Sequence, residues 1–171
     1  MGGRLVSATL SCLDDQMLQT SRTIVIKADP DQLWVLLNDM IAHPERYEPD
    51  VVLTKLTRNE TPVRRTVSRA GQRVEETLEI HREALMIELT VPSSDPGGRA
   101  EPHLSLIHQI VPSGDRTILN LAATWAPVGG DPLEDTSGTV DTVPVETMER
   151  RLANLGNRIQ LMAEELAGKG P

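Results

Sequence analysis

Apolar residues recur along the chain with two spacings, and these spacings predict which segments form strands and which form helices. The β-branched segment at residues 21–28 predicts a first strand. Asp29, Pro30 and Gln32 then have the arrangement of a helix start, with an N-cap, a proline in the first turn and a capping-box spacing. The apolar stripe that begins at Leu33 predicts a helix with one buried face.

After this helix, the pattern predicts a short second helix and then a series of strands. The short helix is expected at residues 44–47, between two prolines. Turn signals separate the expected strands, which lie at residues 51–57, 63–70, 72–82, 85–91, 103–111 and 117–126. Short connections between consecutive strands predict an antiparallel sheet.

The last apolar stripe predicts the longest helix of the chain. Its members alternate three and four positions apart: Val145, Met148, Leu152, Leu155, Ile159, Met162 and Leu166. Gly156 interrupts this helix at a cost of about 1 kcal/mol relative to alanine. We interpret it as a close-packing contact in preference to space left for a ligand.

The long helix needs an apolar partner, and the concave face of the sheet is the available one. We therefore expect a single domain over residues 21–167 with a hollow between the sheet and this helix. Residues 1–20 form an N-terminal arm of uncertain structure in this interpretation, and residues 168–171 form a flexible tail.

Composition and charge exclude several classes of function. The 171 residues suit one domain, and 17 basic against 25 acidic residues give a net charge of −8. This charge argues against a nucleic-acid partner and against docking on an anionic membrane. With two Trp, one Tyr and no Phe, the core must consist mainly of aliphatic side chains.

The N-terminal segment and the cysteine content predict a cytoplasmic protein. Cys12 is the single cysteine, which excludes an internal disulfide and fits a reducing compartment. The first residues lack the pattern of a signal peptide. No run approaches the roughly 18 apolar residues that span a bilayer, so we expect no membrane insertion.

Turn geometry predicts which side chains of the third and fourth strands point inward. If Ala70 and Gly71 form a two-residue hairpin loop, Val67 opposes Val74, Val63 opposes Leu78, and Arg65 opposes Glu76. The aliphatic residues mark the buried face, so Arg65 and Glu76 point inward as well. Two interpretations stay open, because a buried ion pair can simply fix the register or can anchor a ligand and transfer protons.

Three further residues combine an apolar environment with a polar group. His108 falls in an inward row with Leu104, Leu106 and Ile110, where it is either a core residue or an acid or base. Trp34 and Tyr47 lie near the expected first helix, where each either packs in the core or contacts a ligand.

The sequence predicts neither a metal site nor a cofactor. The four histidines form no H-x-x-H or H-x-x-x-H pair. There is no P-loop and no G-x-G-x-x-G segment, so a bound nucleotide has no support.

The order of elements and the local sequence resemble the START, Bet v 1 and polyketide cyclase (SRPBCC) superfamily. Residues 24–51, IVIKADPDQLWVLLNDMIAHPERYEPDV, are similar to that superfamily's opening. Residues 63–80 and the strand that ends at Trp125 resemble its AtaL-like branch. The resemblance implies an α+β helix-grip fold: about seven curved antiparallel strands wrapped on a long C-terminal helix, with two short helices after the first strand.

The resemblance also implies a small-molecule pocket between sheet and helix. The ligand would be hydrophobic or polyketide-like, and acid–base chemistry would assist its cyclisation or dehydration. Glu76 and His108 are the candidates for proton transfer, and Arg65 is the candidate for polarising a carbonyl or orienting Glu76. The candidate wall residues are Trp34, Tyr47, Val67, Val74, Leu78, Leu89, Leu106, Leu121, Trp125, Leu152, Leu155 and Ile159.

Two other classes of function stay open at this point. The protein could carry or sense an apolar ligand without chemistry. Alternatively, its long helix could be an interaction surface beside a vestigial cavity. Fold alone does not choose among these classes, and the sequence also leaves a homodimer open.

Overall fold

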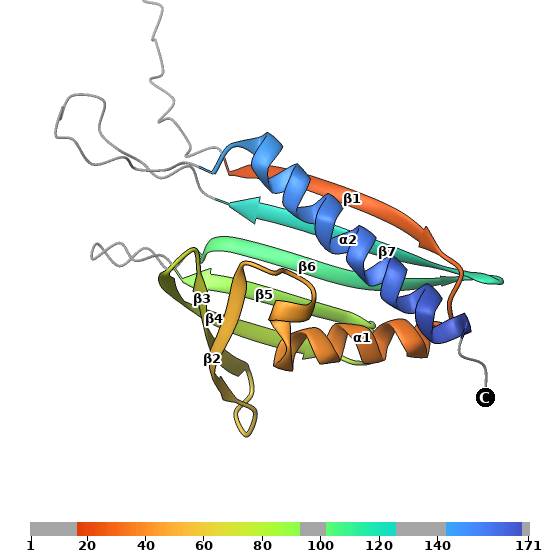
Figure 1. Ribbon diagram of the computed structural model, residues 1–171, viewed down its shortest axis with the longest axis horizontal. Coiled ribbons are helices and arrows are strands. Elements are labelled where there is room, and N and C mark those ends of the chain that lie inside the picture. The colour runs from red at the N-terminus through yellow and green to blue at the C-terminus, as the bar shows by residue number, and fades with distance from the viewer. Residues whose placement is uncertain (1–16, 93–101, 126–142, 169–171) are drawn as a thin grey trace, which may run out of the picture.

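The computed structural model describes residues 17–92, 102–125 and 143–168 (Figure 1). In chain order its elements are β1 (Leu18–Ile26), α1 (Pro30–Ala42), the 3₁₀ helix η1 (Pro44–Arg46), β2 (Val51–Thr57), β3 (Val63–Arg69), β4 (Gln72–His81), β5 (Met86–Pro92), β6 (Pro102–Ser113), β7 (Arg116–Trp125) and α2 (Val145–Gly168). This order confirms the predicted α+β architecture. The predicted N-terminal arm lies mostly outside the described residues.

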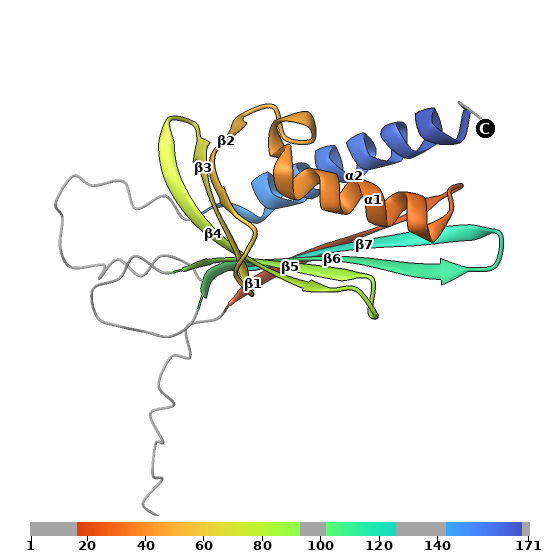
Figure 2. The ribbon, with the colours of Figure 1, turned by 90° about the horizontal axis from the view of Figure 1, so that it is seen from below.

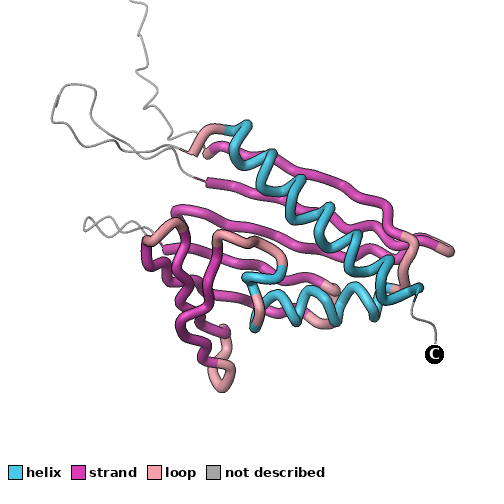
Figure 3. The backbone as a smooth tube through the Cα atoms, viewed as in Figure 1, coloured by secondary structure: helices cyan, strands magenta, loops and turns pink. Residues whose placement is uncertain are grey.

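The seven strands form one antiparallel sheet in the order β1-β7-β6-β5-β4-β3-β2. Figure 2 shows both helices on the same face of this sheet, with β2, β3 and β4 curling up towards them. Helix α2 contacts β1 and β7, and α1 lies beside α2 and contacts β6 (Figure 3). No helix of the described residues lies on the other face of the sheet, which we call the helix-free face.

The first strand is longer than the sequence pattern indicated. It begins at Leu18, not at residue 21, and Leu18 pairs with Trp125 at the end of β7. The polar residues between Leu18 and Ile24 do not show the apolar pattern of a buried strand, because β1 is an edge strand with one largely exposed face. The last part of the predicted arm therefore belongs to the sheet.

Helix α1 starts as its sequence predicts. The Asp29 carboxylate accepts a hydrogen bond from the Asp31 backbone N–H at 2.8 Å, and the Gln32 side chain accepts one from the Asp29 N–H at 3.3 Å. These bonds satisfy backbone donors that a helix start leaves without partners. Pro30 occupies the first turn, where no N–H is required.

The register predicted for β3 and β4 is confirmed. Arg65 pairs with Glu76, and Val67 pairs with Val74. Ala70 and Gly71 both have positive φ, 48° and 80°, which is the geometry of a type I′ hairpin turn. This turn aligns the two strands so that Arg65 and Glu76 point to the same face.

In the next hairpin Leu78 lies opposite Leu89 and Ile80 lies opposite Ile87. Its ladder ends one pair earlier than expected, because Leu85 belongs to the turn, with a φ of 47°. Ile80 lies near this end of the sheet and is 39% exposed. The apolar face of the sheet is therefore more exposed near this turn.

Gly156 is a close-packing residue, as the sequence analysis favoured. It is buried on the face of α2 that contacts β1 and β7. A Cβ atom at this position would overlap the Ile24 side chain and approach Leu121 Cδ1 at 3.3 Å. The absence of a side chain therefore lets α2 lie close to the sheet.

None of the described helices has an apolar stretch of the length that a bilayer crossing needs.

Candidate functional site

Arg65 and Glu76 form a buried ion pair on the helix-covered face of the sheet. Arg65 Nε donates to Glu76 Oε2 at 2.6 Å, and the two side chains are 2% and 1% exposed. The sequence predicted this pairing from the hairpin turn, and its inward direction from the aliphatic residues that share its parity. Because a lone buried charge is costly, the two groups depend on each other.

Arg65 also binds the end of α1. Its Nη1 donates to the backbone oxygens of Met40 and Ile41, at 2.8 and 3.1 Å. These carbonyls belong to the last turn of α1, which contains no basic residue of its own. A guanidinium at a helix C-terminus satisfies free carbonyls and interacts favourably with the helix dipole. Arg65 therefore ties α1 to the sheet.

The ion pair is part of a longer chain of charged groups that reaches α2. Glu48 accepts hydrogen bonds from Arg151 of α2, at 2.6 Å to Nε and 3.2 Å to Nη2, and from Arg69 of β3 at 3.0 Å. Arg69 Nη2 also lies 3.6 Å from Glu76 Oε1. We call these five residues the interior ion-pair chain. It joins α1, β3, β4 and α2.

Sequence reasoning missed Glu48, Arg69 and Arg151. Two of them carried a usable signal, because Arg69 has the same inward parity as Arg65, and Arg151 flanks the apolar stripe of α2 at three residues from Met148. Glu48 lies between η1 and β2, where no periodicity indicates which way a side chain points.

The arginines determine the ionisation of Glu48. Burial would raise the pKa of this carboxyl, but the charges and hydrogen bonds of Arg151, and then of Arg69, lower it to about 2. Glu48 is therefore ionised at neutral pH, and its negative charge lies between the two guanidinium groups.

His108 is buried in β6, in the inward row that the sequence predicted. His108 is 2% exposed, and its Nδ1 is a buried polar atom without a hydrogen-bond partner among the described residues. Burial lowers the pKa of His108 to about 4, although the Glu48 charge and the nearby Ile87 backbone act in the opposite direction. The imidazole is therefore neutral at pH 7.

The low pKa of His108 predicts a loss of stability in weak acid. The unfolded chain takes up a proton near pH 6.5 and the folded chain only near pH 4, so the free energy of unfolding falls as the pH drops through this window. We expect a loss of about 2 kcal/mol between pH 7 and pH 5 from this residue. Urea unfolding at both pH values, on the wild type and on His108→Gln, measures it.

The test compares the change in the free energy of unfolding between pH 7 and pH 5. A variant that is less stable than the wild type at both pH values therefore still gives a valid comparison. His43→Gln is the matched control, because the His43 side chain is 54% exposed. The assignment fails if wild type and His108→Gln lose the same stability between pH 7 and pH 5.

The three aromatic candidates make contacts that link elements of the fold. Tyr47 is buried and its hydroxyl donates to Asp39 Oδ2 at 3.0 Å; burial and this bond raise its pKa well above 10. The Arg82 guanidinium lies over the Trp34 ring, 5.0 Å from its centre. Trp125 Nε1 donates to the Val143 carbonyl at 3.0 Å. These contacts favour the core-packing interpretation.

The aliphatic candidates lie where the sequence predicted. All of the predicted wall residues except Val67 and Val74 belong to the main buried cluster between sheet and helices. Val67 is buried outside this cluster, and Val74 is half-buried. Their use as a ligand-binding wall, and the hollow itself, stay predictions.

A surface pocket of about 420 Å³ lies over β2, β3 and β4. Its lining is polar and includes Lys55, Thr57, Glu60, Arg64, Arg65, Thr66, Glu75, Glu76, Thr77 and Pro92. Most of these side chains have the outward parity of their strands, so this pocket differs from the hollow predicted beside α2.

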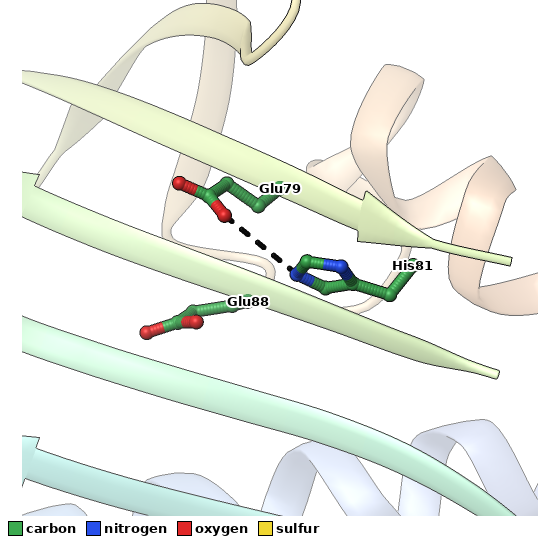
Figure 4. A group of neighbouring side chains, drawn as sticks. All are labelled: Glu79, His81 and Glu88. Carbon is green, nitrogen blue, oxygen red and sulfur yellow. Dashed lines mark ion pairs between the residues drawn. The ribbon is translucent and has the colours of Figure 1, made fainter. Parts of the chain in front are cut away.

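The helix-free face of the sheet carries a group of possible metal ligands that the sequence pattern did not predict. Glu79, His81 and Glu88 offer ligand atoms that all lie within 4.8 Å of one another (Figure 4). Histidine spacing along the chain does not indicate this group, because its third member comes from the neighbouring strand.

The sheet curved around a long C-terminal helix defines a helix-grip protein of the Bet v 1-like class. A family model described as polyketide cyclase / dehydrase and lipid transport matches residues 17–160. The chain belongs to this family, and the superfamily resemblance noted from the sequence is confirmed.

Solved structures show the same fold at low sequence identity. XoxI of Bacillus cereus has a TM-score of 0.61 at 15% identity, over 87% of this chain and 97% of that one. The ZhuI aromatase/cyclase of Streptomyces sp. R1128 has a TM-score of 0.60 at 18% identity, over 87% and 94%. A norcoclaurine synthase mutant of Thalictrum flavum has a TM-score of 0.60 at 10% identity, over 91% and 99%. No curated protein matches the chain.

Proposed function

We propose that this protein binds a hydrophobic small molecule between the sheet and α2, and that His108 forms a hydrogen bond to a polar group of that molecule. The observation that carries the proposal is the buried His108 Nδ1, which has no partner among the described residues. A buried polar atom without a hydrogen bond costs about 1–3 kcal/mol, so a partner from a ligand would offset this cost.

The surroundings of His108 suit an apolar ligand with one polar group. Its neighbours in the inward rows of the sheet are Leu106, Ile110 and Leu121, all of them buried. A neutral imidazole can donate one hydrogen bond and accept another, and the low pKa keeps it neutral at physiological pH. A hydroxyl or carbonyl on a ring or chain of polyketide type would satisfy Nδ1.

Arg65 and Glu76 act in this proposal as positioning residues. Both Glu76 oxygens have an arginine partner, and the Arg65 contacts go to Glu76 and to the end of α1. A carboxylate with these partners has little freedom to exchange protons with a ligand. The interior ion-pair chain holds α1, β3, β4 and α2 in place around His108.

Cyclisation or dehydration of the ligand is the second candidate function. The family description and the aromatase/cyclase among the structural neighbours favour it. His108 would accept a proton from a carbon between two carbonyl groups; the carbanion would form a bond to a second carbonyl carbon; and the new alkoxide would take the proton back. A pKa of about 4 makes His108 a weak general base, so the structure supports binding better than catalysis.

A matched pair of ligands tests the role of His108. 2-Naphthol and naphthalene share an apolar ring system, but only naphthol offers a hydroxyl. We expect the wild type to bind naphthol about three- to tenfold more tightly than naphthalene, which is the worth of one hydrogen bond. Displacement of a fluorescent apolar dye (1-anilinonaphthalene-8-sulfonate) measures both dissociation constants.

Two variants separate the hydrogen bond from apolar binding. His108→Leu should bind both ligands with similar dissociation constants, whereas Gln109→Leu should keep the preference for naphthol. Gln109 is the adjacent residue of β6 and points to the other face of the sheet. The proposal fails if His108→Leu keeps the full preference, or if the wild type shows none.

Two narrower predictions from the sequence go beyond these observations. They are membership of the AtaL-like branch and a cytoplasmic location. Both stay predictions.

A further inference from the structure

The helix-free face of the sheet brings two carboxylates and an imidazole together. Glu79 and His81 are two residues apart on β4, so they point to the same face. Glu88 lies on β5 directly opposite Glu79. Figure 4 shows the imidazole and both carboxylates gathered over the two strands. This group lies on the other side of the sheet from His108.

We propose that Glu79, His81 and Glu88 bind a divalent transition-metal ion, with Zn²⁺ the best match. Two like charges directly opposite each other destabilise an antiparallel pair. A cation between Glu79 and Glu88 would remove this repulsion. One imidazole nitrogen with two carboxylate oxygens is a mixed ligand set that zinc accepts and that calcium and magnesium, which prefer oxygen alone, do not favour.

The present positions of the side chains are compatible with closure around an ion. The ligand atoms all lie within 4.8 Å of one another, so small side-chain movements would bring each of them to the distance of about 2.0–2.2 Å that zinc requires. Glu79 is 58% exposed and His81 is 42% exposed, and exposed side chains change rotamer easily. His81 Nε2 lies 3.7 Å from Glu79 Oε2, too far for a hydrogen bond, so this contact does not commit the nitrogen.

Ser105 orients the third ligand. Its hydroxyl, on β6, donates to Glu88 Oε1 at 3.1 Å. Metal-binding carboxylates commonly have such a hydrogen-bonded partner, which limits their rotation and directs the second oxygen to the ion. Three protein ligands on an exposed face leave a coordination position for water. Bound metal would join β4 to β5 and favour the folded state over the unfolded chain.

Calorimetric titration with Zn²⁺ tests the site on the full chain after treatment with a chelator. We expect one ion per chain. His81→Ala and Glu88→Gln should each weaken this binding by about tenfold or more. The melting temperature of the wild type should rise with Zn²⁺, and this rise should be lost in both variants. Co²⁺ in place of Zn²⁺ should give visible absorption bands that His81→Ala abolishes.

His43→Ala is the matched control. His43 is an exposed histidine beside one carboxylate, with Nδ1 3.5 Å from Glu45, so it makes a two-residue contact of the same chemistry. This variant should bind Zn²⁺ as the wild type does. The proposal is overturned if the wild type binds no Zn²⁺. It is also overturned if His81→Ala and Glu88→Gln bind it unchanged, or if His43→Ala loses it instead.

Discussion

Replacing Arg65 with alanine is expected to lower the free energy of unfolding by about 3–5 kcal/mol, the cost of breaking a buried ion pair by removing one partner. Among the described residues, the Glu76 carboxylate, 1% exposed, would keep Arg69 as its one ion-pair partner, at 3.6 Å. The carbonyls of Met40 and Ile41 would lose their donor at the end of α1. Urea unfolding followed by circular dichroism gives the loss.

The neighbouring residue provides the control for this experiment. The Arg64 side chain is 69% exposed and lies 3.9 Å from Glu60. Surface pairs of this kind contribute about 0–1 kcal/mol, so Arg64→Ala should unfold almost as the wild type does. If Arg65→Ala costs no more than Arg64→Ala, the buried pair does not stabilise the fold as we describe.

A double variant separates the charge from the packing. The double variant Arg65→Met with Glu76→Leu removes both charges of the pair and fills a similar volume. It should therefore recover at least half of the stability that Arg65→Ala loses. Recovery would assign the loss to the uncompensated Glu76 charge. A double variant that is less stable than Arg65→Ala would contradict that assignment.

Replacing Gly156 with valine is expected to cost about 2–3 kcal/mol, because added methyl groups overpack the contact between α2 and the sheet. The first new carbon would already overlap the Ile24 side chain and crowd Leu121. Valine has a higher helix propensity than glycine, so propensity alone predicts a small gain. The sign of the measured change in thermal or urea unfolding therefore tells which effect is larger.

Gly168 is the matched control, since it ends the same helix and has open space around it. Gly168→Val should change the stability by less than about 0.5 kcal/mol. Shortening Ile24 to alanine in the Gly156→Val background should cost less than it does in the wild type, because the two positions share one space. Equal costs of Ile24→Ala in both backgrounds would show that the two residues do not compete for it.

The sequence was most informative where short-range geometry decides the structure. The capping residues before Leu33 predicted the start of α1, and the Ala70-Gly71 turn predicted the register of β3 and β4. That register placed Arg65 and Glu76 inward, which the buried pair confirms. A side-chain period of two leaves only two choices of face, and the neighbouring valines decide between them.

The hydrogen-bond partners of the buried charged side chains could not be predicted in the same way. Glu48 and Arg151 are 103 positions apart, and the hydrogen bonds between them exist only because the segment between η1 and β2 meets α2 in space. The Arg65 contacts to the Met40 and Ile41 carbonyls likewise depend on where the end of α1 lies relative to β3. The interior ion-pair chain holds Glu76 between Arg65 and Arg69, whereas the sequence indicated this residue as a candidate for proton transfer.

The sequence by itself determined the order of the elements, the pairing of neighbouring strands and the direction in which His108 points. Those properties depend on residues within a turn or a strand of one another, where backbone geometry allows few alternatives. Only the tertiary structure decided which charges compensate each other in the interior, that His108 Nδ1 lacks a partner among the described residues, and that Glu79, His81 and Glu88 face one another on the open side of the sheet. These properties depend on contacts between elements, and local patterns do not encode the distances between them.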